Sequence, residues 1–508
     1  MKKRQIVNIV NFLRGVEPRM ERDLLTPLKE QIRLMQQHRL RGTFLLQYDA
    51  LLDPAYTDLL RTLDPAQFEF GVWHEIVEPQ AKACNIPWTG RFAWDWHCHC
   101  GFPVGYTKVQ REQLVDVLFE RFRTVFGYYP RVFGSWFFDS HTARYVCDRY
   151  EIDALCNCKE QFGTDGYTLW GGYYGQGYYP SRNNVFFPAR REEHALPAPL
   201  FRMLGSDPVY QYDAGMDIRQ RVTPSQKVFT LEPSYPDGGG ADPRWVDWYM
   251  RENFNGECLS FGYAQAGQEN SFGWDLMRDG ILYQFPLFER LQNEGKITVE
   301  PLGETGRWYK NTFARTPASA IVAHTAYDDE RKHSVWYSTD TYRINLYGDA
   351  DGFRIRDLHL FGTEIPDPYE NARCTENSAT YETLPVFDGF RHSGNGTAAG
   401  GRLAFADGTP ISCNAPSFQD HGEEAVLHYG AFSVTLRPRS LSVSSEKPFT
   451  LTYRYGKTDD HFPAVKRQDE TVLTLSYNGT AYSLTAAEGR FVSPYCVRSE
   501  NGRITLCF

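Results

Sequence analysis

The chain has 508 residues, of which 42% are hydrophobic and 23% charged, so it is long enough for two or three domains with separate cores. Its formal charge of −9 and the lack of any Lys/Arg run argue against binding to nucleic acid or an anionic membrane. No apolar stretch reaches bilayer-spanning length, and Met1–Phe12 predicts a strand and not a signal peptide. The 11 scattered cysteines favour a reducing compartment, so we expect a cytoplasmic protein.

Apolar runs of strand length recur through the first 270 residues, and helical patterns separate several of them. Near-continuous apolar strands that alternate with helices are typical of parallel strands buried on both faces. Seven such strands predict an α/β fold, an incomplete seven-stranded β/α barrel. A doubly wound sheet is the alternative, but no GxGxxG phosphate-binding turn supports it. The predicted strands are Gln5–Phe12, Gly42–Tyr48, Phe68–His74, Val132–Phe137, Asp153–Cys156, Lys227–Leu231 and Cys258–Tyr263.

Helix signals lie between these strands. Thr107 and Gln110 form a capping box before an apolar stripe that Gly127 ends. Asp242 and Pro243 supply a cap and a first-turn proline for a later helix. Both patterns support crossover helices between parallel strands.

The character of the sequence changes near Thr312, where helical stripes give way to short alternating runs separated by Gly, Asn and Asp. This pattern predicts an all-β sandwich. We therefore expect a catalytic barrel domain at residues 1–312 and a C-terminal sandwich domain at residues 313–508.

An aromatic-rich insertion near residues 160–215 fits neither pattern, and its Gly, Tyr and Pro content predicts an elaborated loop over the barrel. Aromatic rings stack on the apolar faces of sugars. We expect this loop to bind substrate, and a loop packed on its own aromatics is the alternative. The residues expected to bind substrate here are Asp165, Trp170, Tyr178 and Tyr179.

Polar side chains follow most of the predicted strands. In a parallel barrel, the residues at the carboxyl ends of the strands face the mouth and carry function. We expect the mouth to be lined by Arg14, Glu17, Gln47, Asp49, His74, Glu75 and Trp136, with Trp96 and His97 from a nearby loop.

Cleavage of a glycosidic bond requires two carboxyl groups, one to attack or stabilise the sugar and one to protonate the leaving oxygen. Asp139 is the expected nucleophile because it follows a buried strand and Trp136 can stack on a sugar. The alternative for Asp139 is an N-cap of the helix at His141–Tyr150. Glu269 is the expected acid, with Glu232 as the competing candidate.

Histidines offer an alternative chemistry. His74, His97 and His99 could supply imidazoles to a divalent metal, but an HxH spacing alone is weak evidence for a metal site. We therefore expect no cofactor, with a metal on these three residues as the alternative.

Several of these segments resemble the glycoside hydrolase/deacetylase superfamily, which includes polysaccharide deacetylases and glycoside hydrolase families 57 and 38. Phe70–Ile76 resembles the third-strand motif, Trp136-Phe-Phe-Asp139 is similar to the nucleophile motif of family 57, and Glu269–Trp274 to the seventh-strand region with the acid. The resemblance covers about Gln5–Phe313 and implies a β/α barrel followed by a β-sandwich. Asn11–Arg19 and Tyr167–Tyr173 look like a set of uncharacterised bacterial proteins.

The sequence departs from the deacetylase pattern at the metal ligands. Asn11-Phe12 stands where deacetylases have an Asp-Asp pair, and His74–Glu78 replaces their His-x-x-x-His motif. The resemblance therefore implies a glycoside hydrolase with a two-carboxylate, retaining mechanism, acting on an oligosaccharide or glycoside. A metal-dependent carbohydrate deacetylase-like hydrolase and a non-catalytic carbohydrate-binding protein are the alternatives. The expected binding partner is a carbohydrate substrate, and the chain could also form a homo-oligomer.

Overall fold

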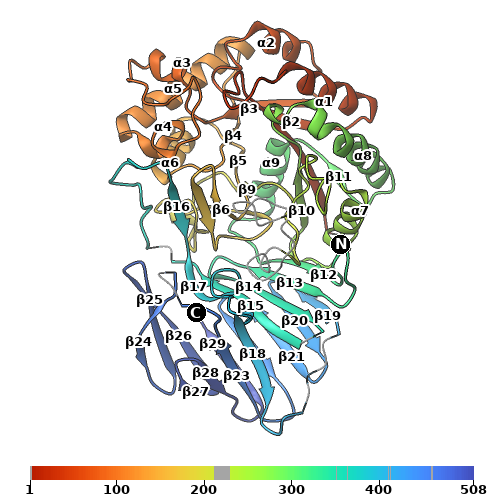
Figure 1. Ribbon diagram of the computed structural model, residues 1–508, viewed down its shortest axis with the longest axis vertical. Helices are drawn as coiled ribbons and strands as arrows, with labels where there is room; N and C mark the ends of the chain where they lie inside the picture. The colour runs from red at the N-terminus through yellow and green to blue at the C-terminus, as the bar shows by residue number, and fades with distance from the viewer. Residues whose placement is uncertain are drawn as a thin grey trace.

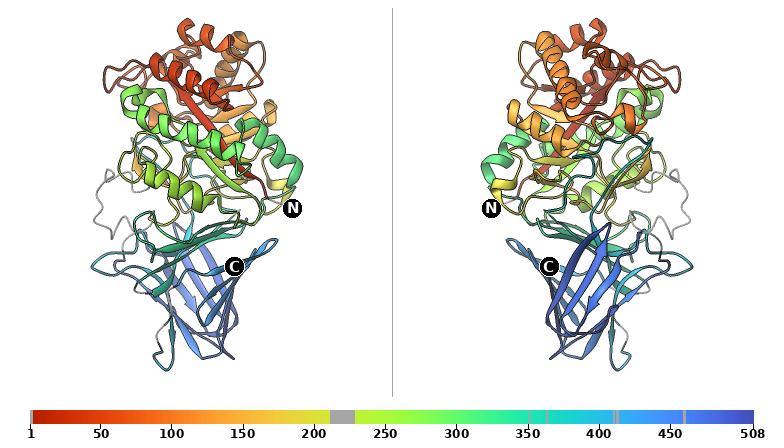
Figure 2. Two further views of the ribbon diagram at one scale, coloured as in Figure 1. Left: turned by 90° about the vertical axis from the view of Figure 1, so that its right-hand side faces the viewer. Right: turned by 90° about the vertical axis from the view of Figure 1, so that its left-hand side faces the viewer.

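The computed structural model describes residues 3–210, 229–350, 352–362, 364–409, 411, 414–458 and 461–508. The chain forms a barrel domain and an antiparallel β domain, which pack end to end along the long axis of the molecule (Figures 1 and 2). The last barrel helix ends at Thr312 and the first strand of the β domain begins at Ser319. No helix in the described part has the length and apolarity needed to cross a membrane.

Seven parallel strands form the barrel sheet, and the predicted incomplete barrel is confirmed. The sheet does not close: no pairing joins its edge strands β9 and β10 in the described part of the chain. Strand β8 (Gly177–Tyr178) pairs antiparallel with β9, and β11 (Thr298–Val299) pairs parallel with β1. The parallel order is β10 (Gly262–Ala266), β1 (Gln5–Leu13), β2 (Gly42–Leu46), β3 (Phe68–Trp73), β4 (Val132–Gly134), β5 (Ala154–Asn157) and β9 (Leu200–Arg202).

The prediction of the sixth strand, at Lys227–Leu231, is wrong. Its place in the sheet is taken by β9, while the described part of the predicted Lys227–Leu231 run forms only an isolated bridge from Thr230 to Ser206. Lys227 and Val228 lie outside the described residues. Leu231 is fully buried in the core, so its apolar character reflects a packed loop and not a sheet position. The last predicted strand is displaced toward the C-terminus, to β10.

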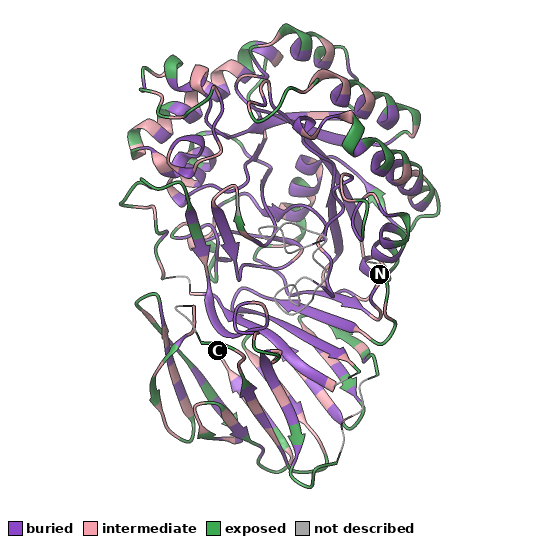
Figure 3. Cartoon of the chain, in the orientation of Figure 1, coloured by how far each residue is buried: buried purple, intermediate pink, exposed green. Residues whose placement is uncertain are grey.

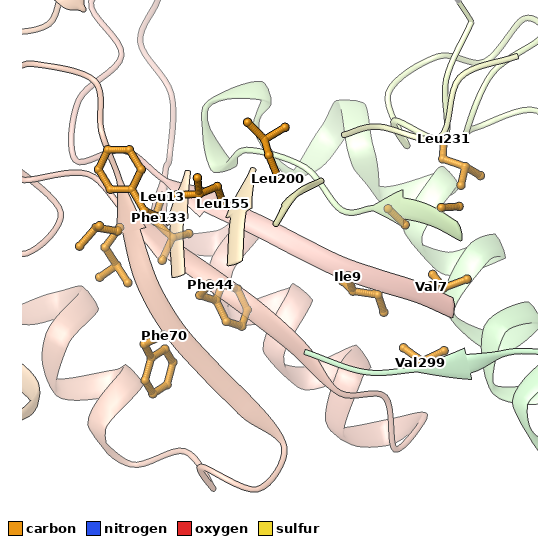
Figure 4. Packing of buried hydrophobic residues seen from close by; sticks show 14 of the residues in the cluster. Val7, Ile9, Leu13, Phe44, Phe70, Phe133, Leu155, Leu200, Leu231 and Val299 are labelled. Atoms are coloured by element: carbon orange, nitrogen blue, oxygen red, sulfur yellow. The ribbon is translucent and has the colours of Figure 1, made fainter. Parts of the chain in front are cut away.

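Helices cover the outer face of the sheet. Alternate strand residues point outward, and these apolar side chains are buried against the helices. Val7, Phe44, Phe70 and Phe133 lie in this outer layer (Figure 4). The other strand residues fill the inside of the barrel, and Figure 3 shows the barrel strands mostly buried and the helices exposed on their outer sides. The helices are α1 (Leu25–Gln37), α2 (Pro54–Arg61), α3 (Glu78–Ala83), α4 (Cys98–Gly101), α5 (Lys108–Phe126), α6 (Ser140–Arg149), α7 (Pro243–Asn253), α8 (Trp274–Asn293) and α9 (Leu302–Thr312).

The helix ends form as their sequences predict. The capping box of α5 is present, with Thr107 accepting from the Gln110 backbone N–H, and Gly127 ends the helix at a φ of 83°. Asp242 caps α7 by accepting from the Arg244 N–H. These caps fix where each helix starts after its strand, and hence which loops surround the mouth.

The predicted all-β sandwich is also confirmed: two antiparallel sheets share one hydrophobic core. One sheet contains β12 (Ser319–Ala323), β13 (His333–Ser338), β14 (Tyr342–Asp349), β15 (Gly352–Leu360), β18 (Gly400–Phe405), β23 (Phe449–Arg454), β28 (Cys496–Arg498) and β27 (Arg490–Ser493), with β17 (Leu384–Asp388) beside β15. The other contains β19 (Ser417–His421), β20 (Glu424–Tyr429), β21 (Phe432–Arg437), β22 (Ser440–Ser444), β29 (Arg503–Cys507), β26 (Thr480–Glu488), β25 (Val472–Tyr477) and β24 (Ala464–Gln468).

A small third sheet joins the two domains. The insertion strands β6 (Gln161–Thr164) and β7 (Tyr167–Trp170) form a hairpin, and β16 (Ala379–Glu382), from the C-terminal half of the chain, pairs parallel with β7. The insertion therefore serves as part of the junction between barrel and sandwich.

Candidate active site

A buried arginine holds two carboxylates together at the carboxyl ends of the barrel strands. Arg14 follows β1 and is 1% exposed. Its Nε and Nη2 donate to the Glu75 carboxylate at 3.0–3.1 Å, and its Nη1 lies 3.2 Å from Glu269 Oε2. Glu75 follows β3 and Glu269 follows β10, so the three side chains come from three separate strands. We call Arg14, Glu17, Glu75, Glu269 and Ser271 the Arg14 cluster.

Glu75 is held on several sides. Besides Arg14, the Trp73 indole donates to Glu75 Oε2 at 2.7 Å and Gln47 Nε2 donates at 3.4 Å. Burial raises the pKa of Glu75, and the Arg14 guanidinium acts against that shift. Hydrogen bonds and an opposite charge favour the ionised form, so this carboxylate is fixed in place and charge-stabilised.

Glu269 has a different environment. Its Oε1 accepts from Ser271 Oγ at 2.7 Å and from Arg14 Nη1 at 3.3 Å, whereas its Oε2 receives no hydrogen bond from the described residues. Burial raises the pKa of Glu269 to about 7, even with Arg14 beside it. Near neutral pH, Glu269 therefore exchanges a proton readily, which is the property of a general acid.

Charged and aromatic groups surround this pair. Arg19 donates to Glu17 at 2.7–2.8 Å and lies 3.5 Å from Asp165, so the insertion reaches the site through Asp165. The Arg14 guanidinium stacks over Trp94 at 3.9 Å from the ring centre. Trp96 is half-buried further out, 5.3 Å from the Arg19 guanidinium. The rim is thus aromatic and charged.

Polar atoms without partners accumulate around Glu75. Gln47 Oε1, Asp49 Oδ2 and Trp136 Nε1 are buried and make no hydrogen bond to the described residues. Burial raises the pKa of Asp49 to about 6. Trp136 packs edge-on against Trp73, whose indole holds Glu75. An unsatisfied buried polar group costs about 1–3 kcal/mol, so a ligand rich in hydroxyls would find both donors and acceptors here.

Asp139, the expected nucleophile, does not join the Arg14 cluster. It is the N-cap of α6, accepting from Thr142 N at 3.0 Å and Thr142 Oγ1 at 2.7 Å. Its Oδ1 also accepts from Arg111 Nη1 at 2.7 Å, and the side chain is fully buried. The capping alternative describes this residue, and the expectation of Asp139 facing the same cavity as Glu75 is wrong.

His74 also lies outside the cluster. Its ring lies against Phe133, in the layer between sheet and helices, and burial lowers its pKa to about 3. Side chains of neighbouring strand residues point to opposite faces, so His74 turns outward where Trp73 and Glu75 turn inward.

The three histidines of the metal alternative do not assemble. In the described ranges, His74, His97 and His99 form no group with donors close enough to share an ion. One such group exists there, made of Asp357, His359 and Asp388 in the sandwich. Asp357 already pairs with Arg343 at 3.0–3.1 Å, so this group belongs to the buried ion pairs between the domains. His97 is half-buried and lies 3.9 Å from Asp95.

The insertion aromatics are not a sugar platform. Trp170, Tyr178 and Tyr179 are 0–7% exposed, and each polar atom has a protein partner: Asp388, Val185 O and Phe313 O. The alternative of an internally packed loop holds for these residues: Trp170 packs against Phe390 of the C-terminal half, Tyr178 against Tyr173 of the insertion, and Tyr179 against Tyr309 of α9.

Glu232 lies apart from Arg14 but within the same end of the barrel. It accepts from Thr230 Oγ1 at 2.9 Å and from Gln268 Nε2 at 3.3 Å, and Gln268 precedes Glu269.

The sequence did not lead us to two polar residues at this end of the barrel, Ser271 and Lys159. Lys159 comes shortly after the fifth predicted strand, the one strand for which we named no residue at the carboxyl end. The rule that residues at the carboxyl ends of barrel strands face the mouth, hereafter the strand-end rule, would have found it.

No protein-family model matches the chain, and no curated protein matches it either. Among solved structures, it is similar to a protein of Parabacteroides distasonis that bears the name glycoside hydrolase/deacetylase, with a TM-score of 0.53 and 13% identity over 75% of this chain and 90% of that one. A polysaccharide deacetylase of Mycobacterium smegmatis also matches, with a TM-score of 0.37 and 11% identity over 61% of this chain and 92% of that chain. A family 57 branching enzyme of Thermococcus kodakaraensis matches with a TM-score of 0.33 and 9% identity over 62% and 72%. The first match shows that the chain has the fold of the glycoside hydrolase/deacetylase superfamily, as its motifs predicted.

Proposed function

We propose that the chain is a glycoside hydrolase that cleaves an oligosaccharide or glycoside with two carboxyl groups, Glu75 and Glu269. The observation that carries the proposal is that one buried guanidinium holds both groups at the barrel mouth, where burial raises the pKa of Glu269 to about 7. Two carboxyl groups in unlike environments are what glycosidic cleavage requires. The fold and the unpartnered polar atoms around Glu75 support a carbohydrate as substrate.

In this mechanism, protonated Glu269 donates its proton to the glycosidic oxygen as the bond to the leaving sugar breaks. The Glu75 carboxylate attacks the anomeric carbon and forms a glycosyl ester in a retaining reaction. Water then releases the sugar, and Glu269 takes the water's proton. Arg14 positions both groups, and a retaining enzyme needs them about 5–5.5 Å apart.

Turnover of nitrophenyl glycosides by Glu75→Gln and Glu269→Gln variants tests the proposal. Loss of the acid or the nucleophile should lower kcat per folded molecule by roughly 10²-fold or more. The melting temperature should stay close to wild type or rise in Glu269→Gln, and it should fall in Glu75→Gln, which removes the main charge partner of the buried Arg14. Glu21→Gln changes an exposed glutamate in the loop after β1 and should leave kcat unchanged. Sugar binding without turnover by the wild-type protein would instead favour a carbohydrate-binding protein.

The ten described cysteines are all free of disulfides. This supports the further proposal that the protein works in a reducing compartment, the cytoplasm.

A further inference from the structure

The open side of the barrel contains a small hollow between the edge strands β9 and β10. Arg202 and Met203 line it from β9 and the residue after it, Gln265 from β10, and Lys159 from the segment after β5. Tyr249 of α7 and Ile321 of the sandwich also contribute to the wall. We call this space the seam hollow. Its open volume of about 20 Å³ exceeds the roughly 10–15 Å³ that one water needs, so it can hold a small chemical group but not a sugar ring.

Lys159 is the unusual member of this wall. It is 5% exposed, yet it makes no hydrogen bond or ion pair with any residue in the described part of the chain. Lysines are almost never buried without a partner, because removing an ammonium from water is costly. A negatively charged group beside Lys159 would remove that cost.

A second cation presents a free donor in the same hollow. Arg202 Nε donates to Cys158 O at 3.0 Å and Nη1 donates to Glu160 Oε1 at 2.8 Å, while Nη2 is buried and has no partner among the described residues. Glu160 does not pair with Lys159, although it is the next residue in the chain. Its Oε1 also accepts from Arg343, and its Oε2 accepts from the Gly171 N–H.

A short series of neighbouring residues leads from the seam hollow to the proposed catalytic pair. Lys159 follows β5 at the same end of the barrel as the Arg14 cluster. Glu232 lies close enough to Cys158 to contribute to the raised pKa of its thiol, which results mainly from burial. Gln268 donates to Glu232 at 3.3 Å and is bonded to Glu269 in the chain. A substrate could thus reach from one site toward the other.

We propose that the seam hollow binds the carboxylate of an acidic sugar through Lys159 and Arg202. The proposal rests on the proposed glycoside hydrolase function and names its substrate class, a glycoside that carries a uronic acid type of carboxylate. A carboxylate accepts hydrogen bonds from the ammonium and from Nη2, and its size suits the hollow. Neutral glycosides leave both donors unpaired.

Acetate and its neutral analogue acetamide test the site without any turnover. At fixed ionic strength, acetate should raise the melting temperature of the wild-type protein in a saturable manner, and acetamide should not. Lys159→Met should remove the acetate effect, Lys159→Arg should keep part of it, and Lys29→Met, at an exposed lysine, should keep all of it. No acetate-specific rise in the wild type, or a rise that persists in Lys159→Met, would overturn the proposal.

Kinetics then separate this proposal from the proposed hydrolase activity. With uronate-bearing nitrophenyl glycosides, Lys159→Met should raise KM roughly 10- to 100-fold, the scale of one charged hydrogen bond, while kcat changes less. Equal KM values for acidic and neutral glycosides in the wild type would reject the carboxylate site and leave the hydrolase proposal standing. Acetate binding without turnover of any glycoside would support the carboxylate site and reject the hydrolase proposal.

Discussion

Arg14 gives two glutamates different chemical properties. Glu75 receives three hydrogen bonds from the guanidinium and further ones from an indole and an amide, whereas Glu269 receives one from the guanidinium, on Oε1, and one from Ser271, and its Oε2 has no hydrogen bond from the described residues. The same buried cation therefore makes more hydrogen bonds to the Glu75 carboxylate than to that of Glu269, and burial raises the pKa of Glu269 to about 7 despite it. This difference assigns the nucleophile and the acid in the proposed reaction.

The raised pKa of Glu269 predicts how stability changes with pH. The folded protein holds this proton up to about pH 7, while the unfolded chain releases it near 4.5. The folded state is therefore favoured by the protonated group at low pH, and that stabilisation is lost as pH rises through about 7. Glu269→Gln, which cannot ionise, should lack this loss.

Urea unfolding of both proteins at pH 5 and pH 8 measures the effect. Relative to wild type, the Glu269→Gln variant should gain stability between the two pH values. Parallel changes in the two proteins would show that Glu269 is ionised throughout and cannot act as the acid.

The strand-end rule predicts the positions of the site residues but not the face to which each points. Arg14, Glu17, Glu75 and Glu269 were all identified from sequence and lie in one cluster. His74 and Glu75 are neighbours at the end of the same strand, yet one turns to the helices and the other to the mouth. A shift of one residue reverses the face, and the apolar run of β3 is buried on both sides, so its pattern carries no signal of direction.

At the scale of elements, the start of α6 determines the role of Asp139. Asp139 and Ser140 are both good capping residues, so the sequence allows either one to cap while the other faces the site. The structure uses Asp139 for the cap and pairs it with Arg111. Ser140 donates instead to Asp367, from the C-terminal half of the chain, a long-range contact that no local pattern reveals.

Replacement of Asp139 should therefore destabilise the fold without removing chemistry. Asp139→Ala loses the cap and leaves Arg111 as an unpaired buried charge, which costs about 3–5 kcal/mol. Asp139→Asn keeps a cap acceptor and should cost less. Chemical denaturation gives these losses, and turnover per folded molecule should stay near wild type. Unchanged stability combined with loss of turnover would return Asp139 to the mechanism.

Short strands limit what a pattern can predict. Strand β9 has three residues, Leu200–Arg202, which is too few for any periodicity. The longer apolar run that ends at Leu231 attracted the prediction instead, because a buried loop and a buried strand have the same composition.

At the scale of the whole molecule, the barrel and sandwich share buried charges. Arg343 of the sandwich donates to Glu160 of the barrel at 2.9 Å and to Asp357 at 3.0–3.1 Å. The insertion aromatics pack at the same junction, where Trp170 donates to Asp388 at 2.7 Å. The sequence shows an aromatic-rich insertion but not its partner, because that partner lies some two hundred residues further along the chain.

This junction supports the wall of the seam hollow, since Ile321 of the sandwich contributes to it. The sandwich thus contributes one residue to the wall at the open side of the incomplete barrel. The barrel mouth remains the place where strands β1, β3 and β10 bring Arg14, Glu75 and Glu269 together.

A crystal structure of the Glu269→Gln variant with a bound oligosaccharide tests the central claim most directly, because the variant should bind substrate without cleaving it. We predict a sugar ring between residues 75 and 269, with hydroxyls paired to Gln47, Asp49 and the Trp136 indole. A ring bound elsewhere, with Glu75 and Arg14 untouched by the ligand, would contradict the account.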